Sequence, residues 1–129
     1  MKKLLLIFLI IYSSQSFAEW TRIGKVENLY VMYIDIDNFR QNDEYLLYWD
    51  LVDFQQTQES SFGKFKSTSS YHQLDCKLFR QKLLAMVLYK DNMGKEILNQ
   101  HNFKDQDWVY PSPNSMPYIK TKQVCSIIQ

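Results

Sequence analysis

The chain has 129 residues, with 15 Lys plus Arg against 14 Asp plus Glu and a formal net charge of +1. This balance provides no basic surface of the kind that nucleic acids or anionic membranes attract, so no nucleic-acid partner is expected. Aromatic residues are frequent, with 9 Tyr, 8 Phe and 3 Trp, and they favour strands and contact surfaces.

The first 18 residues have the pattern of an export signal. Lys2 and Lys3 precede an uncharged apolar run over 4–12, and Ser16-Phe17-Ala18 offers a cleavage site. The run is shorter than the roughly 20 residues that span a membrane, so an uncleaved anchor helix is the weaker alternative. Cleavage would leave 111 of the 129 residues as one domain over 19–129, with no integral membrane span.

Three strands are predicted in the first part of the exported chain. They cover 20–26, with Gly24 marking a bulge, then 29–37 and 45–54. The last two form an antiparallel hairpin around a polar turn. The side chains predicted to point inward are Tyr30, Met32, Ile34 and Ile36 on one strand and Tyr45, Leu47, Trp49 and Leu51 on the other. Asp35 and Asp37 are expected on the solvated face.

The middle of the chain is harder to assign. The polar stretch 55–70 predicts a loop, and 77–90 fits one face of a helix or of a strand equally well. Asp91-Asn92-Met93-Gly94 is typical of a hairpin turn and favours strands on both sides, the second over 95–98. A polar excursion over 100–106 and a last short strand over 107–110 follow.

A helix is predicted at the C-terminal end. Ser115 can cap its first turn, where Pro117 costs no hydrogen bond. The apolar positions over 116–128 suit one buried face; they are Met116, Ile119, Val124 and Ile127. The expected fold is therefore α+β, an antiparallel sheet of about six strands with a C-terminal helix.

Cys76 and Cys125 are the only cysteines, and both lie in the exported part. A disulfide between them is the default in an oxidising compartment and would pin the terminal helix to the sheet. Metal binding, catalysis or an intermolecular bridge are the weaker alternatives, because neither a C-x-x-C motif nor clustered histidines accompany them.

No catalytic, cofactor or metal site is expected, and the chain is not predicted to be an enzyme. The acidic residues from Asp35 onward fail as a calcium loop, because Arg40 stands where glycine is needed and Leu46 where glutamate is needed. His72 and His101 lack zinc-motif spacing, and a weak surface site at His101 with Asp105 and Asp107 is less favoured than a solvated loop. The sequence has neither a Gly-x-Ser-x-Gly motif nor a glycine-rich phosphate loop.

Aromatic residues occupy both parities of the two long predicted strands, so some rings should remain exposed. Exposed tyrosines are typical of protein contacts. The candidates for protein contact are Tyr30, Tyr33 and Tyr48.

An ordered set of segments resembles the surface-adhesin protein E-like domains of Gram-negative bacteria. The segments are Trp20, Tyr33-Ile34-Asp35, 48–54, Leu74-Asp75-Cys76-Lys77, 108–112 and Val124-Cys125. The resemblance implies a small antiparallel sheet with a disulfide-held C-terminal helix, binding of host extracellular-matrix or serum proteins, and a dimeric assembly. No cysteine remains for a lipid anchor, so the periplasm and the cell surface both stay open as locations. The alternative is a periplasmic accessory protein of the cell envelope without a host-binding role.

Overall fold

One antiparallel sheet and one helix organise residues 19–128, which are the residues that the computed structural model describes. The predicted export signal, 1–18, lies outside them. The strands are β1 (Thr21–Val26), β2 (Tyr30–Ile34), β3 (Arg40–Asn42), β4 (Tyr45–Ser60), β5 (Gly63–Asp75), β6 (Arg80–Tyr89) and β7 (Ile97–Asn102). Two 3-10 turns, η1 (Ile36–Asn38) and η2 (Asn92–Gly94), and the helix α2 (Met116–Ile127) complete the fold.

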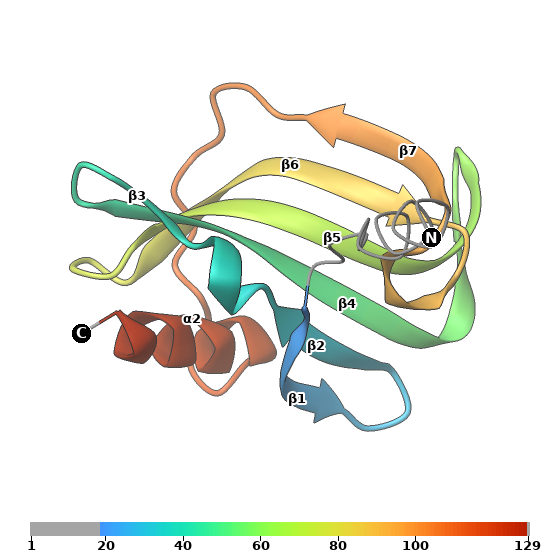
Figure 1. The fold of residues 1–129 in the computed structure, drawn as a ribbon, viewed down its shortest axis with the longest axis horizontal. Helices are drawn as coiled ribbons and strands as arrows, with labels where there is room; N and C mark the ends of the chain where they lie inside the picture. Colours follow the sequence, from blue (N-terminus) through green and yellow to red (C-terminus); the bar gives the residue numbers. More distant parts are fainter. Residues whose placement is uncertain (1–18, 129) are drawn as a thin grey trace, which may run out of the picture.

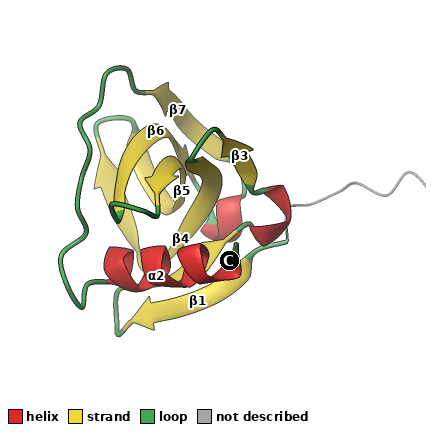
Figure 2. Cartoon of the chain, turned by 90° about the vertical axis from the view of Figure 1, so that its left-hand side faces the viewer, coloured by secondary structure: helices red, strands yellow, loops and turns green. Residues whose placement is uncertain are grey.

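The sheet follows the order β1-β2-β4-β5-β6-β7, with β3 paired to β4 (Figure 1). β2 and β3 pair in succession with the same side of β4, at Ile34–Asp50 and Arg40–Leu47, and η1 lies between them. α2 lies against one face of the sheet and runs alongside β1 (Figure 2). The predicted α+β class, with an antiparallel sheet and a C-terminal helix, is confirmed.

The N-terminal strands follow the prediction closely. β1 carries its irregularity between Arg22 and Gly24, where the bulge was expected. A Cβ at Gly24 would lie 3.2 Å from the Met116 side chain at the start of α2. The absence of a side chain at Gly24 therefore lets the helix approach the edge strand closely.

The predicted loop over 55–70 is wrong. β4 continues to Ser60, and β5 begins at Gly63 after a two-residue turn. Gly63 has a φ of +125°, which a residue with a side chain rarely adopts. The Ser67–Ser70 segment is polar in sequence but buried in the sheet, where the Ser69 hydroxyl is bonded to the Tyr89 hydroxyl at 2.8 Å. The buried positions of this segment therefore carry small hydroxyl side chains that form hydrogen bonds. The alternation of apolar residues that identifies most strands is missing from its sequence.

The ambiguous segment 77–90 forms a strand, β6, and the Asp91–Gly94 turn leads into β7 as expected. β7 begins later than predicted and takes in residues from the polar excursion over 100–106. The strand expected over 107–110 is reduced to a single bridge between Val109 and Gln81. Tyr110 is 62% exposed, so this segment lacks the partner surface that a longer strand would need.

The inward face predicted for 45–54 is wrong. The core beside α2 takes the other parity, Leu46 and Tyr48, together with Ile34 and Leu74. Leu51 is buried, but on the opposite face. Both parities of β4 carry large apolar side chains, so the alternation alone could not decide between the faces.

The buried face of α2 also differs from the prediction. It consists of Lys120, Thr121, Val124 and Cys125. Ile119 and Ile127 are 38% and 46% exposed. Ser115 caps the helix as predicted, accepting from the Tyr118 N–H. The disulfide between Cys76 and Cys125 is present, with the two Cα atoms 5.8 Å apart, and it ties the last turn of α2 to the end of β5.

Candidate binding site

The two faces of the sheet carry different chemistry at its centre. Neighbouring residues of a strand point to opposite faces. Asp50 and His72 therefore face α2, whereas Trp49 and Tyr71 lie on the opposite face of the sheet, away from α2. The first face contains a buried ionic cluster, and the second contains a pocket.

The buried cluster joins β4, β5 and α2. The Lys120 ammonium donates to Asp50 Oδ2 at 2.7 Å, and His72 Nε2 lies 2.8 Å from the same oxygen. The three side chains are 2%, 4% and 9% exposed for Lys120, Asp50 and His72. The Tyr48 ring stacks on His72 at 5.4 Å and lies under the ammonium. Together these contacts fix the position of α2 on the sheet.

The charges of the cluster depend on each other. Burial by itself would raise the pKa of Asp50, but the Lys120 ammonium and the His72 hydrogen bond outweigh it and hold that pKa well below its usual range. Burial would likewise lower the pKa of Lys120, but the Asp50 carboxylate raises it. The pKa of His72 is lowered by burial and by Lys120, so its imidazole is neutral. Burial raises the pKa of Tyr48 to about 12.

These directions predict loss of stability in acid. The unfolded chain takes up a proton on His72 near pH 6.5, whereas the folded chain resists it, so stability is lost as the pH falls from there towards the folded pKa. The lowered pKa of Asp50 adds a loss in the same direction below about pH 4. We expect the free energy of unfolding, measured in urea, to decrease between pH 7 and pH 5.

The variant His72→Gln should remove most of this decrease. His101→Gln replaces the exposed histidine on β7 and serves as the matched control, which should keep the wild-type pH dependence. A His72→Gln protein that loses as much stability between pH 7 and pH 5 as the wild type would contradict this assignment.

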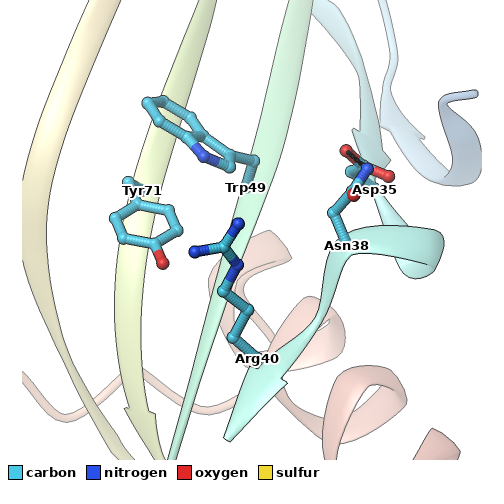
Figure 3. Close-up of a pocket in the computed structure, with 5 residues that line it drawn as sticks. All are labelled: Asp35, Asn38, Arg40, Trp49 and Tyr71. Carbon is cyan, nitrogen blue, oxygen red and sulfur yellow. Dashed lines mark hydrogen bonds between the residues drawn. The ribbon is translucent and has the colours of Figure 1, made fainter. Parts of the chain in front are cut away.

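The pocket lies on the opposite face and has a volume of about 420 Å³. Five side chains line it, and Figure 3 shows them: Asp35, Asn38, Arg40, Trp49 and Tyr71. The aromatic rings form one side, Asp35 and Asn38 lie across from them, and the Arg40 guanidinium projects towards the space between (Figure 3). The lining combines an aromatic surface with a carboxylate, an amide and a guanidinium.

The aromatic side of the pocket is a cross-strand pair. Trp49 on β4 and Tyr71 on β5 are direct partners in the antiparallel register. Their ring centroids are 4.9 Å apart and their planes are inclined by 34°. Both residues are partly exposed and line the pocket.

The polar side of the pocket is held by the turn between β2 and β3. The Asp35 N–H donates to the Trp49 carbonyl at 3.1 Å, which fixes the turn against β4. The Asn38 amide donates to Asp35 Oδ2 at 2.7 Å. Asp35 is only 4% exposed, which corrects its predicted solvated position, and its Oδ1 has no partner among residues 19–128. The turn buries Asp35 because it bends the chain back over the sheet before β3 begins.

Two further cavities extend the pocket along the same face. They measure about 290 and 300 Å³, and each shares Trp49, Val87 and Gln100 with the other. One of them reaches Trp20 at the start of the described chain. We call the pocket and these two cavities, all lined by Trp49, the open-face groove.

The structure separates the three tyrosines predicted as contacts. Tyr48 is 0% exposed and offers no surface to a partner. Tyr33 pairs with Leu51 and lies on the open face, whereas Tyr30 packs on Phe54, 5.9 Å away, on the side of the helix. Sequence reasoning missed Trp49 and Tyr71 as surface residues. The sequence signal that could have identified them is the presence of aromatic residues on both parities of the strands.

Within the described residues, 19–128, no group of three or more His, Cys, Asp or Glu side chains is placed to hold a metal ion. No helix in that part of the chain is long and apolar enough to cross a membrane. His101, considered as a weak metal ligand, packs edge-on against Phe103 at 4.6 Å.

Comparison with known proteins agrees with this architecture. The family model for surface-adhesin protein E matches residues 20–126. A structure of Haemophilus influenzae protein E, crystal form II, is similar with a TM-score of 0.64 and 16% identity, covering 88% of this chain and 91% of that chain. Protein E from non-typeable Haemophilus influenzae is similar with a TM-score of 0.62 and 13% identity, covering 88% and 79%.

At these identities the structural likeness shows the fold alone, and no curated protein matches the sequence. The family match covers nearly all of the part that the structure describes. The chain belongs to the surface-adhesin protein E family.

Proposed function

We propose that this chain is an exported, non-enzymatic binding protein that attaches to host extracellular-matrix or serum proteins. The family is one of surface adhesins, and adhesion requires a partner. The observation that carries the proposal is the open-face groove, where Trp49 and Tyr71 present partly exposed rings beside Arg40. Tyrosine, tryptophan and arginine are the residue types that dominate binding energy at protein interfaces.

Surface plasmon resonance tests this proposal directly. The exported protein, purified from the compartment that contains it, is passed over immobilised vitronectin, laminin and plasminogen. We expect saturable binding to at least one of them. Tyr71→Ala should weaken that binding by roughly tenfold, the effect of losing one interface anchor. Absence of saturable binding to all three proteins would overturn the host-binding role.

Tyr110→Ala is the matched control for Tyr71→Ala. Tyr110 is also exposed, but it lies outside the open-face groove. Its removal should leave the affinity unchanged. Equal losses of affinity in both variants would indicate nonspecific binding to the protein surface and would exclude the groove as the binding surface.

The second candidate is an accessory protein of the periplasm that binds another envelope component. Both cysteines form the disulfide, so neither is free to carry a lipid anchor. Fractionation of cells producing the full chain separates the two candidates. Recovery at the surface or in the medium favours the adhesin, and recovery in the periplasm alone favours the accessory protein. The same preparation, in sedimentation analysis, tests the homodimer that the family resemblance implies.

A further inference from the structure

The pocket at one end of the open-face groove has the chemistry of a sugar site. Its aromatic side is the Trp49–Tyr71 pair, whose ring centroids lie 4.9 Å apart with the planes inclined by 34°; we call this packed pair the platform. The face of an aromatic ring carries negative charge density and attracts weakly positive C–H groups. A pyranose ring presents such C–H groups on its faces and hydroxyl groups around its edge.

The polar side of the pocket matches the edge of such a ring. A sugar hydroxyl both donates and accepts a hydrogen bond. The Asp35 carboxylate oxygens accept, the Arg40 guanidinium only donates, and the Asn38 amide does both. All three side chains line the same pocket as the platform. One ring on the platform could therefore bond hydroxyls to groups of both kinds.

The charges of the pocket favour a neutral ligand. Arg40 disfavours a bound cation, and Asp35 disfavours a bound anion, so their formal charges cancel within one site. A purely apolar ligand would leave these polar groups without partners, which is costly. A polyhydroxylated neutral ring avoids both penalties.

The Asp35 carboxylate adds an independent observation. Its Oδ2 accepts from Asn38, but its Oδ1 has no hydrogen-bond partner in the part of the chain that the structure describes. Buried polar atoms without partners are rare, and each one calls for an explanation. The oxygen itself is covered, so a ligand hydroxyl would bond to it only if the Asp35 side chain turned towards the pocket.

We propose that the pocket formed by Asp35, Asn38, Arg40, Trp49 and Tyr71 binds a saccharide. One sugar ring lies on the Trp49–Tyr71 platform, and its hydroxyl groups bond to the three polar side chains. The adjoining cavities, which share Trp49, receive the next units of an oligosaccharide. This inference goes beyond the proposed function, because it names a ligand class that both host glycoproteins and bacterial envelope polysaccharides contain.

A glycan array with two arms tests the proposal. One arm carries mammalian glycoprotein glycans, and the other carries peptidoglycan fragments and lipopolysaccharide core oligosaccharides. The probe is the exported protein produced from the full chain. We expect saturable binding in one arm, which identifies the source, and a shift of the Trp49 indole N–H resonance when the bound saccharide is titrated. Failure to bind in both arms would overturn the proposal.

Two variants locate the site. Arg40→Ala changes an exposed side chain and should keep the fold, yet weaken saccharide binding by roughly tenfold, as expected for one hydrogen bond to a charged group. Trp49→Leu removes the platform and should weaken it by at least roughly tenfold. Lys122→Ala, which removes an exposed charge from α2, is the control and should change nothing. Binding that survives both Arg40→Ala and Trp49→Leu would exclude this pocket.

The outcomes separate this proposal from the proposed function. Binding to vitronectin, laminin or plasminogen without binding to any glycan would retain the adhesin role and overturn the sugar site. Glycan binding without affinity for these three proteins would support the sugar site and overturn the host-protein-binding role.

Discussion

Lys120→Met is expected to lower the free energy of unfolding by about 3–5 kcal/mol, the cost of leaving one partner of a buried ion pair alone. Lys120 is 2% exposed, and its ammonium lies 2.7 Å from Asp50 Oδ2. Methionine has nearly the same shape, so the loss comes from the Asp50 charge rather than from a cavity. Urea unfolding of the exported protein at pH 7 measures it. Lys122→Met, on the exposed side of the same helix, should change stability by less than about 0.5 kcal/mol.

The pH dependence of stability distinguishes the loss of the ion pair from a loss of packing. Burial lowers the pKa of His72 in Lys120→Met as in the wild type, but the lowering by the Lys120 charge is gone, while Asp50 still raises it. His72 should therefore take up a proton more readily in the variant, and the variant should lose less stability between pH 7 and pH 5 than the wild type does. The double variant Asp50→Asn with Lys120→Met should recover part of the lost stability. If Lys120→Met loses less than about 1 kcal/mol at pH 7, the cluster does not hold the helix as proposed.

The second large effect is expected from the disulfide. Cys76 and Cys125 are 49 positions apart in the sequence. Closing a loop of that length stabilises the folded state by roughly 4 kcal/mol in the chain-entropy model. The double variant Cys76→Ser with Cys125→Ser should lose about that much, a large share of the roughly 5–15 kcal/mol typical of a domain.

Amide hydrogen exchange shows which elements are destabilised when the disulfide is removed. Amides of α2 should exchange faster than in the wild type, because the bridge ties its last turn to β5, whereas amides in the middle of β4 should keep more of their protection. Treatment of the wild type with reductant should give it the exchange rates of the variant. The same treatment should leave the variant unchanged, because it has no disulfide to reduce. An equal melting temperature in the oxidised wild type and in the variant would show that the bridge contributes nothing.

Local signals in the sequence predicted the elements whose cause is local. Ser115 and Pro117 marked the start of the helix, because capping and proline tolerance depend on a few neighbouring residues. Gly24 marked the bulge of β1. The predicted export signal and the presence of only two cysteines in the sequence indicated the pairing of Cys76 with Cys125.

The misassigned elements depended on distant partners. The polar stretch over 55–70 forms strands because β4 and β5 pair with each other, and β5 pairs in turn with β6. No pattern within 55–70 contains that information. Likewise, Lys120 is buried only because Asp50, 70 residues away in the sequence, supplies its counter-charge.

The sequence did not predict the candidate site for the same reason. Trp49 and Leu47 were expected in the core, since large apolar side chains on alternate positions usually are. The opposite parity of β4 faces α2, where Leu46 and Tyr48 join the apolar core and Asp50 pairs with Lys120. The Trp49 ring lies on the other face, where Tyr71 of the next strand and the turn at Asp35 and Asn38 complete a pocket.

The sequence by itself determined the C-terminal helix, the disulfide, the antiparallel strands around the first turns and the family resemblance, because each rests on neighbouring residues, on residue count or on ordered motifs. Only the tertiary structure decided which face of β4 is covered, that Lys120 is a core residue, and that Trp49 and Tyr71 form an open platform. The physical reason is that both parities of β4 could bury apolar area, and they are distinguished only by the packing of α2 on one face, where Lys120 pairs with Asp50.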